Sequence, residues 1–154
     1  MAGLFEHNTL AGMELRNRAV RSATYEGLAS DAGLVTAALI NEMAKLAEGE
    51  TGLIISGHTY VSEEGKASQR KLAADRDECI PGLKQMADAV HHADGKIIIQ
   101  LAHAGAMALD AVNAVGPSPL PGRNGTSVCH ELSPAEIARI VEKFIAAAER
   151  VKQA

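Results

Sequence analysis

The chain has 154 residues and a formal net charge of −4, and 47% of its residues are hydrophobic while only 3% are aromatic. This apolar content suffices for a packed core, which argues against a disordered chain. The weak negative charge, with both signs interspersed, gives no sign of a nucleic-acid or anionic-membrane partner. The length suits one domain or part of one.

The cysteines and the N-terminus bear on the cellular compartment. Cys79 and Cys129 lie far apart and belong to no CxxC pair or Cys/His cluster, so we expect reduced thiols and no zinc site. The N-terminal sequence lacks the basic and apolar segments of a secretory signal. No apolar run approaches the roughly 20 residues of a membrane span. The sequence therefore predicts a cytoplasmic protein without a membrane segment.

Hydrophobic periodicity and capping signals predict strands that alternate with helices. In chain order we expect a hairpin from residues 4–5 and 13–15, a strand at 19–22, a helix from Thr36 to Glu48, a strand at 53–56, a helix from Pro81 to about Ala93, a strand at 96–101 and a helix that begins at Ser133. The helix start at Ser133 has the clearest sequence pattern, because Ser133, Pro134 and Glu136 form a capping box with proline at the first helical position.

This alternation predicts a parallel sheet with right-handed crossovers. The helix-to-strand links are short, whereas the strand-to-helix links at 23–35, 57–80 and 102–132 are long. Both a (β/α)₈ barrel and a doubly wound sheet build their sites from the loops that follow the strands. The long loops thus predict the functional face without deciding between these folds.

Gln100 is the most informative polar residue, because its long amide interrupts the apolar run 96–101. A buried amide needs partners for its carbonyl and its NH₂ group. It can serve as a core hydrogen bond to backbone, or match the donor–acceptor edge of a flat heterocycle. His58 and His103 each follow a strand on the functional face, where a structural role is as good a hypothesis as a functional one. Arg123 is a weaker candidate for binding a substrate anion.

Several segments along the whole chain carry a family resemblance. They include RSATYEG at 21–27, GLIISG at 52–57, QLAHAG at 100–105, and shorter matches at 4–5, 15–18, 116–118, 130–133 and 136–137. In their order and spacing they resemble the N-terminal half of the old yellow enzyme family, the FMN-dependent NADH:flavin oxidoreductases. The resemblance implies a partial (β/α)₈ TIM barrel of about three βα units plus the N-terminal hairpin. Residues 1–154 would be the N-terminal part of an FMN-binding domain whose C-terminal half is absent.

The same resemblance implies a set of cofactor-binding residues. Ala23, Thr24 and Tyr25 occupy the segment that borders the isoalloxazine ring in the family. His58 stands where relatives contact the flavin through the backbone. Gln100 occupies the position of the amide that binds the flavin pyrimidine edge, which agrees with its independent interpretation as an amide seeking a planar partner.

The implied function is that of an FMN-dependent NAD(P)H oxidoreductase of the ene-reductase type, which reduces a small activated alkene through flavin. The family's substrate-anchoring histidines and phosphate-binding loops come later than this sequence extends, so we assign no catalytic residue and expect this chain alone to be inactive. The alternative is a non-catalytic, truncated half-barrel fragment acting at most as an assembly partner. In either case, open sheet edges predict self-association.

Overall fold

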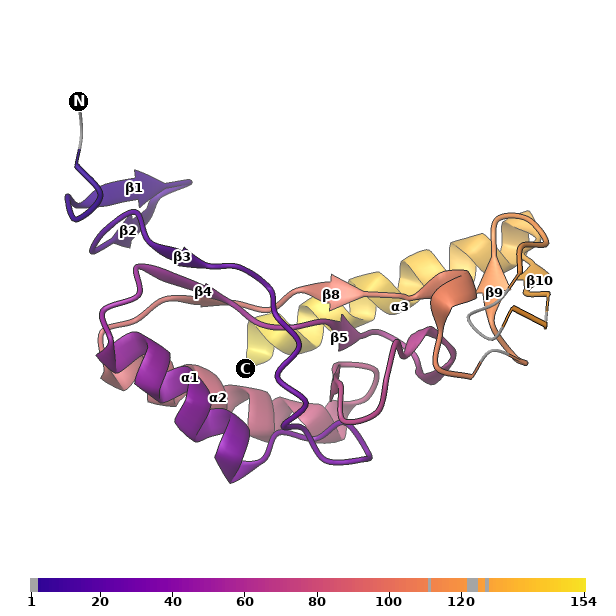
Figure 1. Cartoon of the computed structure of the whole chain (residues 1–154), viewed down its shortest axis with the longest axis horizontal. Helices are drawn as coiled ribbons and strands as arrows, with labels where there is room; N and C mark the ends of the chain where they lie inside the picture. The colour runs from indigo at the N-terminus through magenta and orange to yellow at the C-terminus, as the bar shows by residue number, and fades with distance from the viewer. Residues whose placement is uncertain (1–2, 111, 122–124, 127) are drawn as a thin grey trace.

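The computed structural model of the protein describes residues 3–110, 112–121, 125–126 and 128–154. Two neighbouring helices, α1 (Ala37–Glu48) and α2 (Ile80–His92), cover one side of a short parallel sheet (Figure 1). The long helix α3 (Pro134–Gln153) packs against α2 and the last sheet strand. The alternation predicted from the sequence is confirmed, and the three helices begin and end within about one residue of their predicted limits.

The sheet is built from four segments of the chain, two of which are interrupted partway. Its first part has the strand order β3–β4–β7 and its second part the order β6–β5–β8, with every pairing parallel. The bounds are β3 Val20–Arg21, β4 Leu53–Ile55, β5 Thr59–Tyr60, β6 Leu72–Ala73, β7 Ile97–Ile98 and β8 Leu101–Ala102. Thus β4 continues into β5 and β7 into β8, while the neighbour on one side changes from β3 to β6.

The remaining elements flank this sheet. A hairpin precedes it, and short elements fill the long loops after its strands (Figure 1). They are β1 Asn8–Leu10, β2 Met13–Leu15, the 3₁₀ helices η1 Glu63–Gly65, η2 Asp77–Cys79 and η3 Gly105–Met107, and the parallel pair β9 Val115–Gly116 and β10 His130–Glu131.

The N-terminal hairpin is present, but its first strand is not at residues 4–5 as predicted. β1 pairs antiparallel with β2 across the two-residue loop of Ala11 and Gly12. Both loop residues have positive φ, at 48° and 84°, and such tight loops join strands that start immediately on either side. Phe5 lies outside this pairing and is 81% exposed.

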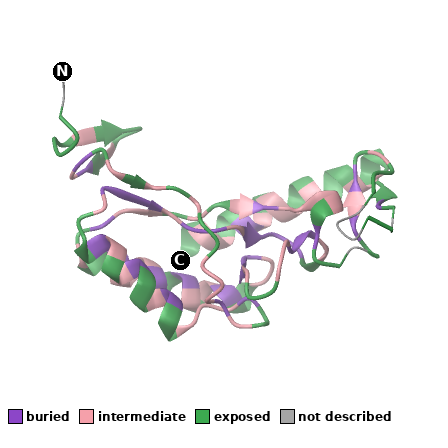
Figure 2. Cartoon of the chain, viewed as in Figure 1, coloured by how far each residue is buried: buried purple, intermediate pink, exposed green. Residues whose placement is uncertain are grey.

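The core lies between the sheet and the inner faces of the helices, where buried positions are concentrated in Figure 2. In α1, Leu39, Met43 and Ala47 recur every four residues and are buried, as expected for one face of an amphipathic helix. Met86 and Ile54 meet them with no exposed surface. The apolar contact of these side chains provides the main favourable term for folding.

Other apolar surfaces are uncovered. The α3 residues Ile137, Val141 and Ile145 are 46%, 50% and 49% exposed, although they form a regular stripe. On the sheet, Val20 and Ile98 are 50% and 40% exposed. Within the part of the chain that the structure describes, no strand pairs with the outer edge of β7. Contiguous apolar surface of this kind usually marks a contact face.

Two further findings concern membrane-spanning helices and the thiols. Among the described residues, no helix combines the length and apolarity needed to cross a bilayer. Cys79 and Cys129 are both buried and both free.

The start of α3 generates a pH prediction. The N–H and hydroxyl groups of Ser133 donate to the Glu136 carboxylate at 2.8 and 2.7 Å, and these bonds lower the pKa of Glu136 from 4.5 to about 2. Because the folded pKa is depressed, this stabilisation is fully present above pH 4.5 and is lost as the pH falls toward about 2. We expect Glu136→Gln to lose this pH-dependent part, as measured by thermal unfolding at a series of pH values. Glu142→Gln, on the exposed face of the same helix, is the control and should unfold with the wild-type pH profile.

Candidate active site

A half-buried ion pair joins β3 and the segment after it to the end of β4. Nη1 of Arg21 donates to Oε1 of Glu26 at 2.8 Å and to the carbonyl of Ile55 at 3.0 Å. The same Glu26 oxygen accepts the backbone N–H of Gly57 at 3.0 Å. The two charged side chains are only 18% and 12% exposed. A Cβ at residue 57 would collide with the Glu26 carboxylate and the Thr24 carbonyl, so glycine permits this close approach.

Beyond this tie, three polar side chains stand in one line across the strand ends. Thr59 pairs with Leu72 on one side and with Leu101 on the other. One position earlier on each strand path come His58, Lys71 and Gln100. By extension of this register the three residues lie side by side, with Gln100 exposed and His58 and Lys71 half-buried. We call them the Lys71–His58–Gln100 row.

Gln100 does not occupy the buried position that the sequence analysis expected. Its side chain is exposed, and the residue lies at the break between β7 and β8. Its backbone is nevertheless held on one side of the strand, because its N–H donates to Oγ of Ser56 at 3.0 Å and its carbonyl accepts the N–H of Thr59 at 2.9 Å. Among the hydrogen bonds of the described residues, none uses the Gln100 amide group. The core hydrogen-bond interpretation of this amide is therefore wrong.

The segment after β3 lies beside the row. Tyr25 is 51% exposed, and its hydroxyl donates to the carbonyl of Gln69 at 2.7 Å. Its ring lies against Gly27, whose φ of 66° suits glycine. Thr24 is exposed and its hydroxyl donates to the Ser22 carbonyl at 3.1 Å, whereas Ala23 is half-buried. This segment thus offers one aromatic face and one hydroxyl on the loop side of the sheet.

The electrostatics of the row differ along its length. Burial, and secondarily the charge of Lys71, lower the pKa of His58, which favours its neutral imidazole. The Lys71 ammonium lies 4.3 Å from the centroid of the Tyr25 ring, a cation–π distance. The sequence analysis missed Lys71. The only feature of the local sequence that could have pointed to Lys71 is its position directly before the short apolar run 72–74.

The other candidates lie elsewhere. His103 packs against Gly65, and its Nδ1 accepts the N–H of Gly105 at 3.1 Å. Its Nε2 is buried without a hydrogen-bond partner, and burial lowers its pKa. These contacts fit a structural histidine beside η1. Arg123 lies outside the described residues.

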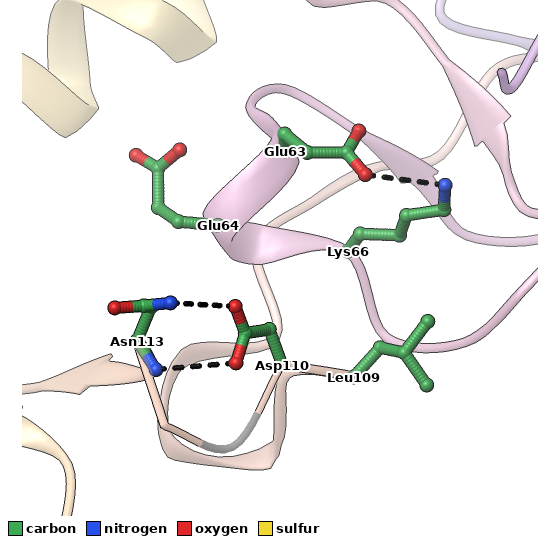
Figure 3. A pocket seen from close by; sticks show the side chains of 6 residues that line it. All are labelled: Glu63, Glu64, Lys66, Leu109, Asp110 and Asn113. Carbon is green, nitrogen blue, oxygen red and sulfur yellow. Dashed lines mark hydrogen bonds and ion pairs between the residues drawn. The ribbon is translucent and has the colours of Figure 1, made fainter.

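A pocket of about 300 Å³ beside η1 is separate from the row (Figure 3). Its acidic groups are already engaged: Glu63 pairs with Lys66 at 3.3 Å, and Asp110 accepts the side-chain amide of Asn113 at 2.7 Å. Figure 3 shows the Glu64 carboxylate turned away from Asp110. We therefore do not place the active site there.

The donor set of the row fits a flat heterocyclic cofactor. The free amide of Gln100 can both donate and accept in one plane. The neighbouring Tyr25 ring and neutral His58 provide apolar and weakly polar surface without a competing carboxylate. Such a mixture of apolar surface and few fixed polar groups is typical of cofactor sites.

Comparison with known proteins places the chain in a family. The model of the NADH:flavin oxidoreductase / NADH oxidase family matches residues 3–154, and the chain belongs to this family. It is 36% identical to a metal reductase of Desulforamulus reducens, covering 100% of this chain and 23% of that protein. It is 34% identical to an NADPH dehydrogenase of Listeria monocytogenes, covering 100% of this chain and 46% of the relative. The chain thus spans less than half the length of each of these relatives.

Solved structures agree on the fold. The old yellow enzyme homologue from Zymomonas mobilis matches with a TM-score of 0.89 at 24% identity, over 99% of this chain and 46% of that one. A morphinone reductase variant in complex with tetrahydroNAD matches with a TM-score of 0.88 at 26% identity, over 99% and 47%. The predicted fold class, a partial (β/α)₈ barrel, is confirmed, and FMN and NAD(P)H are the cofactors of this family.

The tie between Arg21 and Glu26 gives a testable prediction. Glu26→Gln keeps an oxygen for the Gly57 N–H but leaves the Arg21 guanidinium without its counter-charge. We expect a loss of about 2–3 kcal/mol in the free energy of unfolding, somewhat below the cost of breaking a fully buried pair, because both side chains retain some exposure. Urea unfolding measures this loss. Glu42→Gln, at an exposed α1 position, should change stability little, and an equal loss in both variants would contradict the role assigned to the tie.

Proposed function

We propose that the protein functions as an FMN-dependent NAD(P)H oxidoreductase of the ene-reductase type, and that this chain supplies the part of the barrel that faces the flavin ring. The observation that carries the proposal is the Gln100 amide: it is exposed and unpaired among the described residues, while its backbone is fixed to Ser56 and Thr59. Because its backbone is fixed, the free amide stays within side-chain reach of a planar ligand that binds beside this strand.

The site residues have distinct proposed roles. The Gln100 amide pairs with the pyrimidine edge of the ring, while Ala23, Thr24 and Tyr25 border the ring. His58 offers its backbone and a neutral imidazole beside the amide. FMN, when bound, supplies the hydride chemistry between NAD(P)H and an activated alkene. The protein's part is to bind and orient the ring, and we assign no catalytic residue within this chain.

Two relatives and the two free thiols support the finer parts of this proposal, which are the reductant, the substrate and the cellular compartment. The Listeria relative is an NADPH dehydrogenase and the morphinone reductase structure contains tetrahydroNAD, which supports a nicotinamide reductant here. The resemblance to old yellow enzymes supports a small alkene as the substrate. The free, buried thiols of Cys79 and Cys129 suit the reducing cytoplasm.

Substitution of Gln100 tests the proposal. We expect the chain itself to bind FMN weakly, with Kd on the order of 1 mM, and to lose it on gel filtration, because the proposed contacts involve the ring and not the phosphate. FMN should shift the backbone amide resonances of Thr24, Tyr25, His58 and Gln100 in NMR titrations. Gln100→Leu should weaken binding roughly tenfold or more, since an unpaired polar edge costs about 1–3 kcal/mol.

The control for this titration is Gln85→Leu, which removes an exposed amide from α2 and should leave the affinity unchanged. Equal affinity of wild type and Gln100→Leu, with both folded by circular dichroism, would contradict the role of Gln100. Shifts confined to the pocket of Figure 3 would contradict the proposed site as a whole.

A second candidate function is that of an assembly partner, and the uncovered edge of β7 favours it. Carbonyls of residues 96, 98, 100 and 102 accept hydrogen bonds from the neighbouring strand path. Because successive backbone groups of a strand point to opposite edges, those of Ile97 and Ile99 face outward. A groove of about 320 Å³ lies along this edge between α2 and the end of α3. An open apolar edge is a template for another strand, so we propose self-association through it.

The edge predicts concentration-dependent association. We expect the chain to form dimers or larger species in light scattering, and Ile98→Lys to reduce them, because a charge on an edge strand opposes pairing. Ile98 is 40% exposed, so the variant should still fold. Val112→Lys, at a loop position 74% exposed, is the matched control and should associate like wild type. A monomer at all concentrations would rule out this second candidate.

A further inference from the structure

Lys71 carries a charge that the described residues do not neutralise. None of the ion pairs among the described residues includes its ammonium group, which lies over the face of the Tyr25 ring, 4.3 Å from the centroid. The residue is half-buried, and burial lowers its pKa while the charge of Glu26 partly opposes this. Removing an ammonium group from water without a carboxylate partner costs free energy. We therefore looked for a function that explains the position of Lys71.

The position of Lys71 is set by its neighbours on both sides. Arg70 adopts a φ of 53°, uncommon for a residue with a side chain, and its Nε donates to the carbonyl of Ala29 at 3.3 Å. Immediately after Lys71, Leu72 enters β6 and pairs with Thr59. The lysine therefore leaves a fixed turn at the edge of the sheet, opposite His58 in the row.

The Tyr25 ring beneath the ammonium is fixed as well. Its hydroxyl is bound to the Gln69 carbonyl at 2.7 Å, two residues before Lys71. The ring and the ammonium thus belong to two segments that are joined by a hydrogen bond and a cation–π contact. Tyr25 is also the residue proposed above to border the flavin ring.

Among Arg21, Glu26, His58 and Lys71, one positive charge is left over. Glu26, the carboxylate that acts on Lys71 electrostatically, is already bound by Arg21 and by the Gly57 N–H. His58 beside Lys71 favours its neutral form. The Arg21–Glu26 pair contributes no net charge, so Lys71 remains as the uncompensated cation of the row.

We propose that Lys71 is a cofactor-binding residue that makes the site favour reduced, negatively charged FMN over oxidised FMN. This inference rests on the flavin site proposed above. A preorganised cation in a partly dehydrated site stabilises a negative charge beside it more strongly than water does. Oxidised flavin has a neutral ring, whereas two-electron reduction in mildly alkaline solution leaves the ring negatively charged. The phosphate group is common to both forms, so the difference between them isolates the ring.

The test compares the affinity of the chain for the two redox forms of FMN. Wild type, Lys71→Gln and Lys71→Arg are titrated by NMR with oxidised FMN and, under anaerobic conditions, with dithionite-reduced FMN. We expect wild type to prefer the reduced form and Lys71→Gln to lose roughly tenfold of this preference, equivalent to about 30 mV for a two-electron couple. Lys71→Arg should retain the preference, because it retains the charge. Lys84→Gln, on an exposed part of α2, is the control and should match wild type.

The outcomes separate this inference from the proposal on which it rests. Binding of both forms with an unchanged preference in Lys71→Gln would overturn the role of Lys71 and leave the flavin site intact. An equal loss of affinity for both forms would also overturn it, because it would assign Lys71 to the phosphate or to the fold. Absence of any shift at Tyr25, His58 and Gln100 with either form would overturn the flavin site itself, and the role of Lys71 with it.

Discussion

The contact between Glu26, Arg21 and the Gly57 N–H is the constraint on which the rest of the candidate site depends. It joins the segment after β3 to the end of β4, and it satisfies a carboxylate, a guanidinium and a backbone amide at once. Burial makes each of these groups expensive to leave unpaired. The pair thus fixes the backbone around Tyr25. Because the Lys71 ammonium lies over the Tyr25 ring, the pair also positions the surface that Lys71 contacts.

The same architecture explains why Gln100 is exposed while His58 and Lys71 are half-buried. Core packing covers the face of the sheet toward α1 and α2, and the opposite face is uncovered at Ile98 and Gln100. The exposed Ile98 and the free Gln100 amide are two positions apart on this uncovered face. Members of the family that are longer than this chain match it over only part of their length, and in a closed barrel such inward-facing positions are filled in layers.

Local sequence signals predicted most of the elements but not their surroundings. Thr36 and Ser133 cap α1 and α3 as expected, because a cap is decided by a few adjacent residues. The apolar run 96–101 correctly indicated a strand path, yet the inference that Gln100 is buried was wrong. An apolar run shows that a strand can be covered on both faces, but coverage depends on elements far away in sequence. The hairpin strand was misplaced because the turn at Ala11–Gly12 fixes which residues can pair.

By itself, the sequence determined the family and the alternation of strands and helices, and it singled out Gln100 as an amide in an apolar run, because these follow from local patterns and from motifs in order. Only the tertiary structure brought Lys71 beside His58 and onto the Tyr25 ring. That juxtaposition depends on the register of β5 with β6 and on the turn at Arg70. Register is chosen by which faces the whole sheet buries, so no local pattern around residue 71 could have revealed it.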